Sequence, residues 1–166
     1  LASDAEWLLQ IDTDMVFEPD LLDRLLAAAD PDDKPIVGGL CHGKAEHEGG
    51  RVSYFPTIYY HTDKGAARAS RYPENTMLEV HATGGACLLI HRTVLEEMGE
   101  KYGEPFPWFQ EEVIDGRRCS EDVVFCIRAR ELGHKIYVHT GIDVGHVKKE
   151  VVDAATYQAW REVQDA

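Results

Sequence analysis

Two carboxylates one residue apart, Asp12 and Asp14, are the first side chains whose types and spacing suit a chemical role. They follow the apolar run Trp7–Ile11, which is typical of a buried strand, so the pair is expected at the rim of a sheet. Mg²⁺ and Mn²⁺ prefer oxygen ligands and often take one or two protein carboxylates while substrate phosphates complete the shell. The pattern predicts a cation site, with an Asp-rich turn after a strand as the alternative.

A second acidic pair, Glu121 and Asp122, follows Ser120 at the expected start of a helix. Carboxylates in a first helical turn are stabilised by the helix dipole, which alone would explain their presence. The functional interpretation is that one of them accepts a proton from an acceptor hydroxyl. The preceding Arg117 and Arg118 would suit phosphate binding, although a solvated loop is the simpler interpretation.

His146 ends an expected strand and precedes Lys148 and Lys149. A single histidine is more often a hydrogen-bonded structural residue than a metal ligand. At this position, however, it would be able to complete a metal site from the opposite side while the lysines face phosphate.

Alternating strands and helices are expected to position these residues in one α/β domain over residues 1–166. We expect strands at 7–11, 36–40, 77–81 and 86–90, a strand or hairpin within 51–60, and one bent strand or two short ones over 135–147. Helices are predicted over 19–29, 94–98, 121–132 and 153–163, with loops at 42–51 and 64–75. The first helix is expected to bury one apolar face made of Leu21, Leu22, Leu25, Leu26 and Ala29.

Composition and charge exclude several classes of protein. The 166 residues are 44% hydrophobic and 28% charged, which is ordinary for a globular domain. The net charge of −13 argues against a nucleic-acid partner, which would call for a basic patch. No apolar run approaches the ~18 residues that a membrane span requires. Four cysteines without Cys-x-x-Cys spacing favour a reduced setting, so we expect a cytoplasmic protein.

The order of these motifs resembles the second half of a GT-A type glycosyltransferase, most closely the large inverting family 2 group. The segments that carry the resemblance are WLLQIDTDMVFEPDLLDRLL, TGGACLLIHRTVLEEMG and SEDVVFCIRARELGHKIYVHTGIDVGH. The resemblance implies a Rossmann-like mixed sheet flanked by helices. It also implies metal-dependent, inverting transfer of a sugar from a nucleotide-diphosphate donor to a hydroxyl of a glycan, lipid or small molecule.

The resemblance implies a role for each donor-side residue. Asp12 and Asp14 would bind the donor and its Mn²⁺ or Mg²⁺ ion, with Asp14 as the direct ligand and Asp12 on the ribose or on a metal-bound water. His146 would complete the metal site. Gly84 and Gly85 would lie near the donor sugar and the acceptor, where the lack of a side chain allows close approach.

The resemblance also assigns the acceptor side. Asp122 would be the general base that deprotonates the acceptor hydroxyl, and Glu121 would position the acceptor. Direct displacement assisted by such a base inverts the anomeric centre.

One departure from the family pattern concerns the start of the chain. Family members place several strands and helices before the Asp-x-Asp segment, whereas eleven residues precede Asp12. We therefore expect a partial or minimal domain that lacks the N-terminal nucleotide-binding strands, with an uncovered sheet edge suited to self-association. Two other functions stay open: a non-catalytic binding or assembly module of the same shape, and a sugar nucleotidyltransferase. The latter would be expected to carry a Gly-rich basic loop near its N-terminus, which this sequence does not show.

Overall fold

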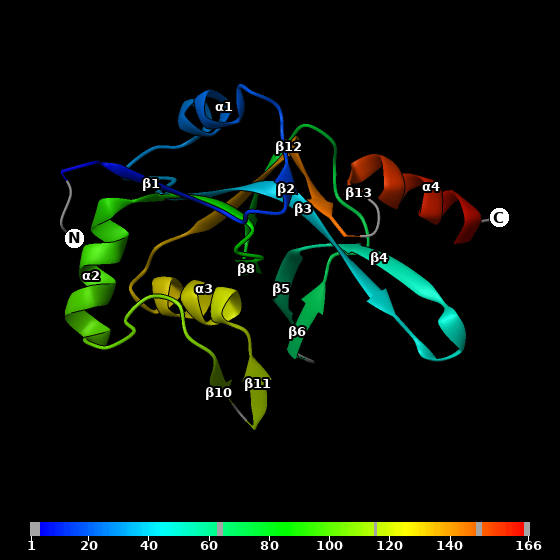
Figure 1. The fold of residues 1–166 in the computed structure, drawn as a ribbon. Helices are drawn as coiled ribbons and strands as arrows, with labels where there is room; N and C mark the ends of the chain where they lie inside the picture. The colour runs from blue at the N-terminus through cyan, green and yellow to red at the C-terminus, as the bar shows by residue number, and fades with distance from the viewer. Residues whose placement is uncertain (1–3, 63–64, 115, 149–150, 165–166) are drawn as a thin grey trace.

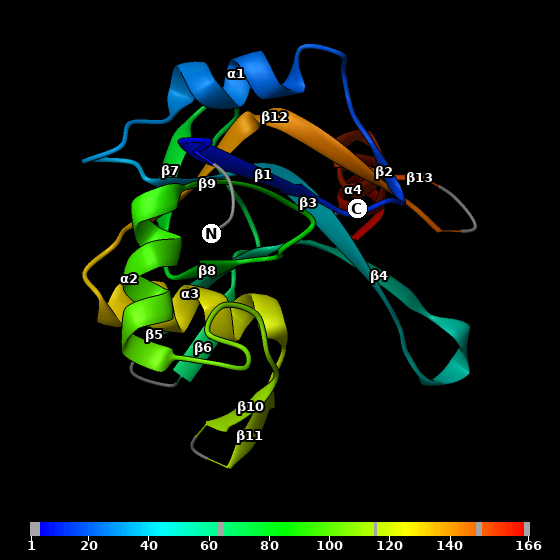
Figure 2. The same cartoon turned by 60° about the vertical axis from the view of Figure 1, so that its left-hand side comes forward.

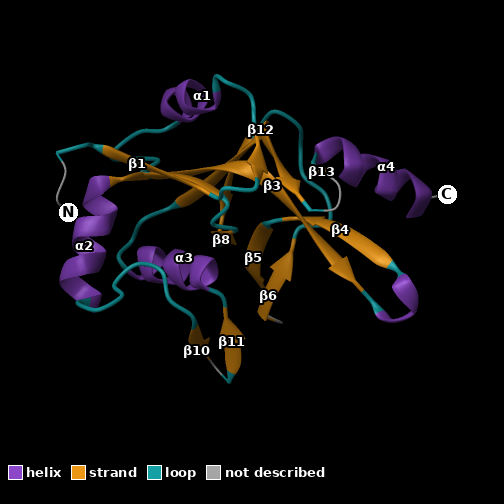
Figure 3. Cartoon of the chain, viewed as in Figure 1, coloured by secondary structure: helices purple, strands orange, loops and turns teal. Residues whose placement is uncertain are grey.

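The computed structural model describes residues 4–62, 65–114, 116–148 and 151–164, and its central element is a mixed β-sheet with helices on both faces (Figure 1, Figure 3). The sheet follows the order β1 (Trp7–Ile11), β9 (Cys87–His91), β3 (Ile36–Glu46), β12 (Ile136–Val147) and β13 (Val151–Val152). Beside this path, β2 (Met15–Val16) and β7 (Met77–Val80) pair with β12, and β4 (Val52–Pro56) pairs with β3. The pairing of β3 with β12 is parallel, whereas β1 and β3 both run antiparallel to β9.

Smaller sheets and four α-helices complete the structure. A three-stranded sheet contains β6 (Gly65–Arg68), β5 (Ile58–Thr62) and β8 (Ala82–Thr83), and a hairpin contains β10 (Glu112–Ile114) and β11 (Arg117–Cys119). The α-helices are α1 (Leu21–Ala28), α2 (Arg92–Tyr102), α3 (Glu121–Glu131) and α4 (Ala154–Gln164), and a short 3₁₀ helix, η1, spans Glu48–Gly50. This mixed sheet flanked by helices confirms the fold class expected from the sequence.

The two faces of the sheet bury separate apolar clusters, because successive strand residues point to opposite faces. On β9, Leu88 and Ile90 belong to the cluster beneath α2 and α3, whereas Cys87 and Leu89 belong to the cluster beneath α1. Figure 2 shows α1 on one side of the sheet and both α2 and α3 on the other. The helices therefore hold the sheet from both sides.

An irregularity in β12 reverses the faces along that strand. Between His139 and Asp143, β12 advances by four residues while its partner β3 advances by one, from Gly39 to Leu40. An odd number of extra residues exchanges the two faces of a strand. Consistently, Ile136 and Val138 lie in the α2–α3 cluster, whereas Ile142 and Val144, which have the same sequence parity, lie in the α1 cluster.

The structure corrects the expected bounds of several elements. The predicted loop 42–51 is wrong in its first half, because β3 continues to Glu46 while its polar residues pair with β4. Strand β6 lies in the predicted connection 64–75, and α2 runs through Gly99 to Tyr102 instead of ending at Met98. Both β3 and β6 pair in hairpins with the neighbouring strand of the chain, and the polar or small residues of these segments lack the apolar pattern that indicates a strand.

The predicted apolar face of the first helix is only half buried. Leu21 and Leu25 are buried against the sheet, but Leu22 and Leu26 are 43% and 40% exposed. Each exposed leucine lies one residue, about 100° of helical rotation, beyond a buried one. The helix contacts β3 and β12 through the narrower stripe, so its second pair of leucines faces away from the core.

Strand β1 lies at an edge of the sheet, since β9 is its one hydrogen-bonded neighbour among the described strands (Figure 2). Such an edge was expected from the sequence, and self-association through it stays a prediction. Within the described residues, no helix combines the length and the apolar character that crossing a bilayer requires.

Candidate active site

Asp12 and Asp14 occupy the tight turn that joins the edge strand β1 to β2. Three backbone hydrogen bonds fix this turn. The Asp12 N–H donates to the Ala86 carbonyl at 3.0 Å, the Met15 N–H donates to the Asp12 carbonyl at 3.3 Å, and the Val147 N–H donates to the Asp14 carbonyl at 2.8 Å. The predicted cation site is thus anchored to the Gly-Gly segment on one side and to β12 on the other.

The structure brings Asp14 and His146 together across 132 residues of sequence. His146 Nε2 lies 2.9 Å from Asp14 Oδ2, and Lys148 Nζ lies 3.5 Å from the same oxygen. The hydrogen bond from His146, assisted by the nearby positive charges, lowers the pKa of Asp14 below its usual value. Lys149, the second lysine of the sequence interpretation, lies outside the described residues.

The Asp14–His146 contact is a hydrogen bond, and its carboxylate oxygen and imidazole nitrogen are both atoms that can bind a divalent cation. In the part of the chain that the structure describes, however, no group of three His, Cys, Asp or Glu side chains is preassembled for a metal. These residues fit an ion whose remaining ligands come from a bound substrate, with Lys148 displaced towards its phosphates.

Asp122 is held in a defined orientation at the start of α3. Its Oδ2 accepts a hydrogen bond from the Gly85 N–H at 3.3 Å, and its Oδ1 accepts from the Val123 N–H at 2.7 Å. Ser120, the expected N-cap, has cap-like backbone angles, but its hydroxyl donates to Asp122 Oδ1 and makes no capping hydrogen bond with a backbone N–H of the helix. The carboxylate is therefore positioned by the glycine segment and by the first helical turn together. Glu121 is exposed beside it.

The Gly84–Ala86 segment connects the two acidic motifs. Gly85 binds Asp122 through its N–H and accepts from Gln10 Nε2 at 2.9 Å through its carbonyl, while Ala86 accepts from the Asp12 N–H. A Cβ on Gly85 would lie 3.0 Å from Gln10 Nε2 and 3.3 Å from Asp122 Cβ. The close approach at Gly85 is to other parts of the protein, and the approach of Gly84 and Gly85 to a donor sugar and acceptor stays a prediction.

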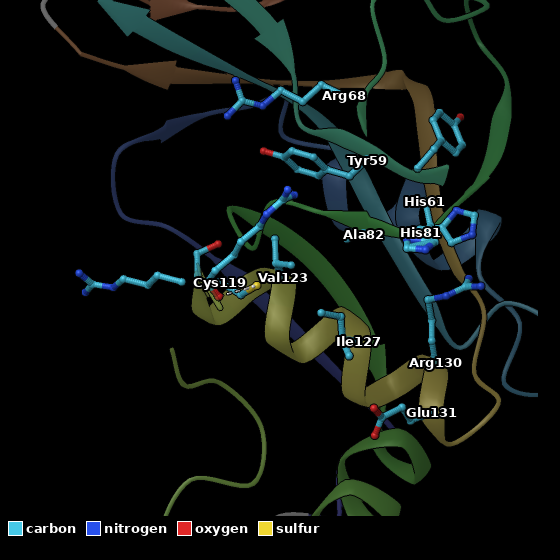
Figure 4. Close-up of a pocket in the computed structure, with 14 residues that line it drawn as sticks. Tyr59, His61, Arg68, His81, Ala82, Cys119, Val123, Ile127, Arg130 and Glu131 are labelled. Atoms are coloured by element: carbon cyan, nitrogen blue, oxygen red, sulfur yellow. Dashed lines mark hydrogen bonds between the residues drawn. The ribbon is translucent and has the colours of Figure 1, made fainter. Parts of the chain in front are cut away.

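A groove of about 630 Å³ runs along α3 between Ser120 and Glu131 (Figure 4). One wall carries side chains from α3, including Val123, Ile127 and Arg130, and the facing wall carries Tyr59 from β5 and Arg68 from β6. Sequence reasoning missed this groove, because its walls come from separate elements of the chain. The one local signal was the Arg-Arg pair directly before the Ser-Glu-Asp motif.

Comparison with known proteins shows a family match over most of the chain. The model of a family described as "Glycosyltransferase like family 2" matches residues 2–164. Among solved structures, the crystal structure of A197 from STIV is similar, with a TM-score of 0.50 and 20% sequence identity. That match covers 87% of this chain, which spans 59% of the length of the other chain. At this identity the likeness concerns the fold alone. No curated protein matches the sequence.

Proposed function

Because the chain belongs to the glycosyltransferase-like family 2, we propose that it transfers a sugar from a nucleotide-diphosphate donor to an acceptor hydroxyl with Mg²⁺ or Mn²⁺ as cofactor. The observation that carries this proposal is the joining of two carboxylate sites by one short backbone segment. The backbone N–H of Asp12 donates to the carbonyl of Ala86, and the carboxylate of Asp122 accepts from the N–H of the preceding Gly85. Neighbouring residues therefore hold the backbone of Asp12 and the carboxylate of Asp122, which supports their action on one bound pair of donor and acceptor.

On the donor side, Asp14 and His146 are proposed to hold the cation, with Asp12 on the ribose or on a metal-bound water. The cation supplies Lewis-acid stabilisation of the negative charge on the departing nucleotide diphosphate. Lys148, already 3.5 Å from Asp14, is placed to bind a phosphate oxygen once the cation neutralises that carboxylate. Gly84 and Gly85 are proposed to border the donor sugar and the acceptor.

On the acceptor side, Asp122 is proposed to take the proton of the attacking hydroxyl, and Glu121 to position the acceptor. A correctly placed general base contributes a factor of roughly 10²–10⁴ in rate. One-step attack from the face opposite the leaving diphosphate inverts the anomeric centre. The hydrogen bonds from Gly85 and Val123 support this role, because they hold the carboxylate in place before a substrate arrives.

The proposal is tested by calorimetric titration of the full-length protein with UDP and with GDP, with and without Mn²⁺. We expect nucleotide affinity to rise at least tenfold with Mn²⁺, and the Asp14→Ala variant to lose this gain. The matched control is Glu100→Ala, which removes an exposed carboxylate on α2. Affinity that is indifferent to Mn²⁺, or that survives in Asp14→Ala, would contradict the proposed cation site.

Turnover separates this proposal from the non-catalytic alternative. Metal-linked nucleotide binding accompanied by slow hydrolysis or transfer of a UDP-sugar supports an enzyme. The same binding with no release of UDP from any sugar nucleotide tested would favour a binding or assembly module.

A further inference from the structure

The groove along α3 carries a charge opposite to that of the protein. The chain has a net charge of −13, yet the basic side chains that line the groove outnumber a single glutamate. The basic residues are Arg68, Arg117, Arg118, Arg130, His61 and His81, and the acidic one is Glu131. A concave surface lined by one sign of charge attracts ligands of the other sign.

Three of these arginines keep their charge available. Arg118 is paired with Glu111, but Arg68, Arg117 and Arg130 have no carboxylate partner among the residues that the structure describes. Arg68 stacks on the ring of Phe55, with 3.8 Å between the guanidinium carbon and the ring centroid. Stacking holds a guanidinium without neutralising it, so its N–H groups remain suited to an anion.

The far end of the groove concentrates positive charge around His81. Burial lowers the pKa of His81, and the charges of Arg130 and His61 lower it further. The Nδ1 atom of His81 is buried without a hydrogen-bond partner in the described structure. Arg130 itself makes one long contact, 3.5 Å, with the Val80 carbonyl. The lowered pKa keeps His81 neutral, so Arg130 supplies the positive charge at this end of the groove.

The near end of the groove lies at the start of α3, next to the expected general base, although Asp122 is not among the lining residues. Ser120 and Val123, which flank Asp122, both line it, and the Ser120 hydroxyl binds the Asp122 carboxylate. Burial raises the pKa of Tyr59 on the facing wall, with Arg68 opposing and the Asp122 charge adding to the rise. The charge of Asp122 thus reaches Tyr59. The aromatic face of Tyr59 suits the C–H side of a sugar ring.

We propose that this groove binds an acceptor bearing an acidic group, a phosphate or a carboxylate, with the reactive hydroxyl at Asp122 and the acidic group at Arg130 and His81. The inference rests on the proposed transferase function and adds the chemical class of the acceptor. Eight residues of helix α3 separate Asp122 from Arg130, which corresponds to about 12 Å. The hydroxyl and the acidic group therefore belong to different parts of an extended acceptor.

The test measures binding without donor or metal, so its outcome is independent of the transfer reaction. Calorimetry compares a neutral disaccharide with the same disaccharide carrying a terminal phosphate and with one carrying a terminal uronate. We expect one or both acidic ligands to bind at least tenfold more tightly than the neutral one, and the tighter of the two identifies the acidic group. Equal affinity for all three ligands would overturn the proposal.

Variants locate the binding site. Arg130→Gln is expected to weaken the acidic ligand about tenfold, as loss of a hydrogen bond to a charged group predicts, and to leave the neutral ligand unchanged. Arg51→Gln, an exposed arginine outside the groove, is the matched control for net charge. Equal losses in both variants would show general charge attraction and contradict the groove assignment. His81→Gln, at the same end of the groove, repeats the test if Arg130→Gln does not fold.

The two proposals fail separately. Preferred binding of the acidic ligand without Mn²⁺-linked nucleotide binding would contradict the transferase function and support the anion-binding groove. The reverse result would keep the transferase and remove the acidic acceptor.

Discussion

The N–H of Gly85 donates a hydrogen bond to Oδ2 of Asp122 at 3.3 Å, although the two residues are 37 positions apart. This contact connects the segment before β9 to the start of α3. The opposite side of Gly85 binds the side chain of Gln10 on β1. The orientation of the expected general base therefore depends on Gly85. Any larger residue at this position would require its neighbours to move.

The Gly85→Ala variant is expected to lose activity more than stability. The new Cβ would lie 3.3 Å from Asp122 Cβ and 3.0 Å from Gln10 Nε2, so these neighbours must give by a few tenths of an ångström. Because a displacement of a catalytic group by about 1 Å costs about 10²-fold in rate, this smaller shift is expected to cost up to ~10-fold, whereas mild overpacking costs about 1 kcal/mol of unfolding free energy. Measurement of kcat and of a urea unfolding curve for the variant and the wild type checks this prediction. Unchanged kcat with reduced stability would show that the contact is only structural.

The Asp122→Asn variant is expected to lower kcat by roughly 10²–10⁴-fold, because the amide no longer accepts the proton of the acceptor hydroxyl. The fold should persist, since the amide oxygen still accepts from the Val123 N–H. Steady-state kinetics and a thermal melt measure both effects. Glu100→Gln, at an exposed position of α2, is the control. Activity within twofold of the wild type would refute Asp122 as the base.

The buried His42 predicts an acid-sensitive fold. It is 1% exposed, and burial lowers its pKa to about 4 from 6.5. The unfolded chain takes up this proton below pH 6.5 while the folded chain does not, so stability falls as the pH decreases from 6.5 towards 4. The loss from this group is about 3 kcal/mol at most.

Urea titrations at pH 7, 5.5 and 4.5 test this prediction in the wild type and in His42→Gln. Asp143, whose Oδ1 lies 3.8 Å from His42 Nδ1, has a pKa raised by burial and acts in the opposite direction, because it favours the folded state as the pH falls. The difference between the two proteins isolates the histidine. Parallel curves over this range would contradict the prediction.

Two Gly→Ala substitutions are expected to change the stability of the protein in opposite directions. In Gly39→Ala, the new Cβ would lie 2.8 Å from Val144 Cγ2, where β3 approaches the irregular part of β12, and about 1–3 kcal/mol of stability is lost. In Gly99→Ala, the Cβ meets nothing within 4 Å inside α2, and stability rises by about 0.5–1 kcal/mol. Urea unfolding of both variants provides the measurement. A loss in Gly99→Ala would show that α2 is packed differently.

The elements that the sequence predicted well are those with a local cause. Strand β1 follows from an apolar run and helix α3 from apolar residues with Ser120 before them and Gly133 after them, and the bounds of both were placed correctly to within one residue. The polar half of β3 and the strand β6 were missed, because their hydrogen bonds come from β4 and β5 and not from any pattern of their own residues. Where these strands pair depends on how β3 and β5 are positioned in the folded chain.

The sequence by itself determined the types and the order of the chemical groups: the carboxylates Asp12 and Asp14, the Ser120–Asp122 motif and the later His146. Only the tertiary structure decided which of them meet. The reversal of faces within β12 precedes His146, whose side chain meets Asp14, and the packing of β5, β6 and β8 against α3 gathers Arg68, His81 and Arg130 around one groove. Sequence spacing specifies neighbours along one helix or strand, whereas contacts between elements depend on register and packing, which emerge when the whole chain folds.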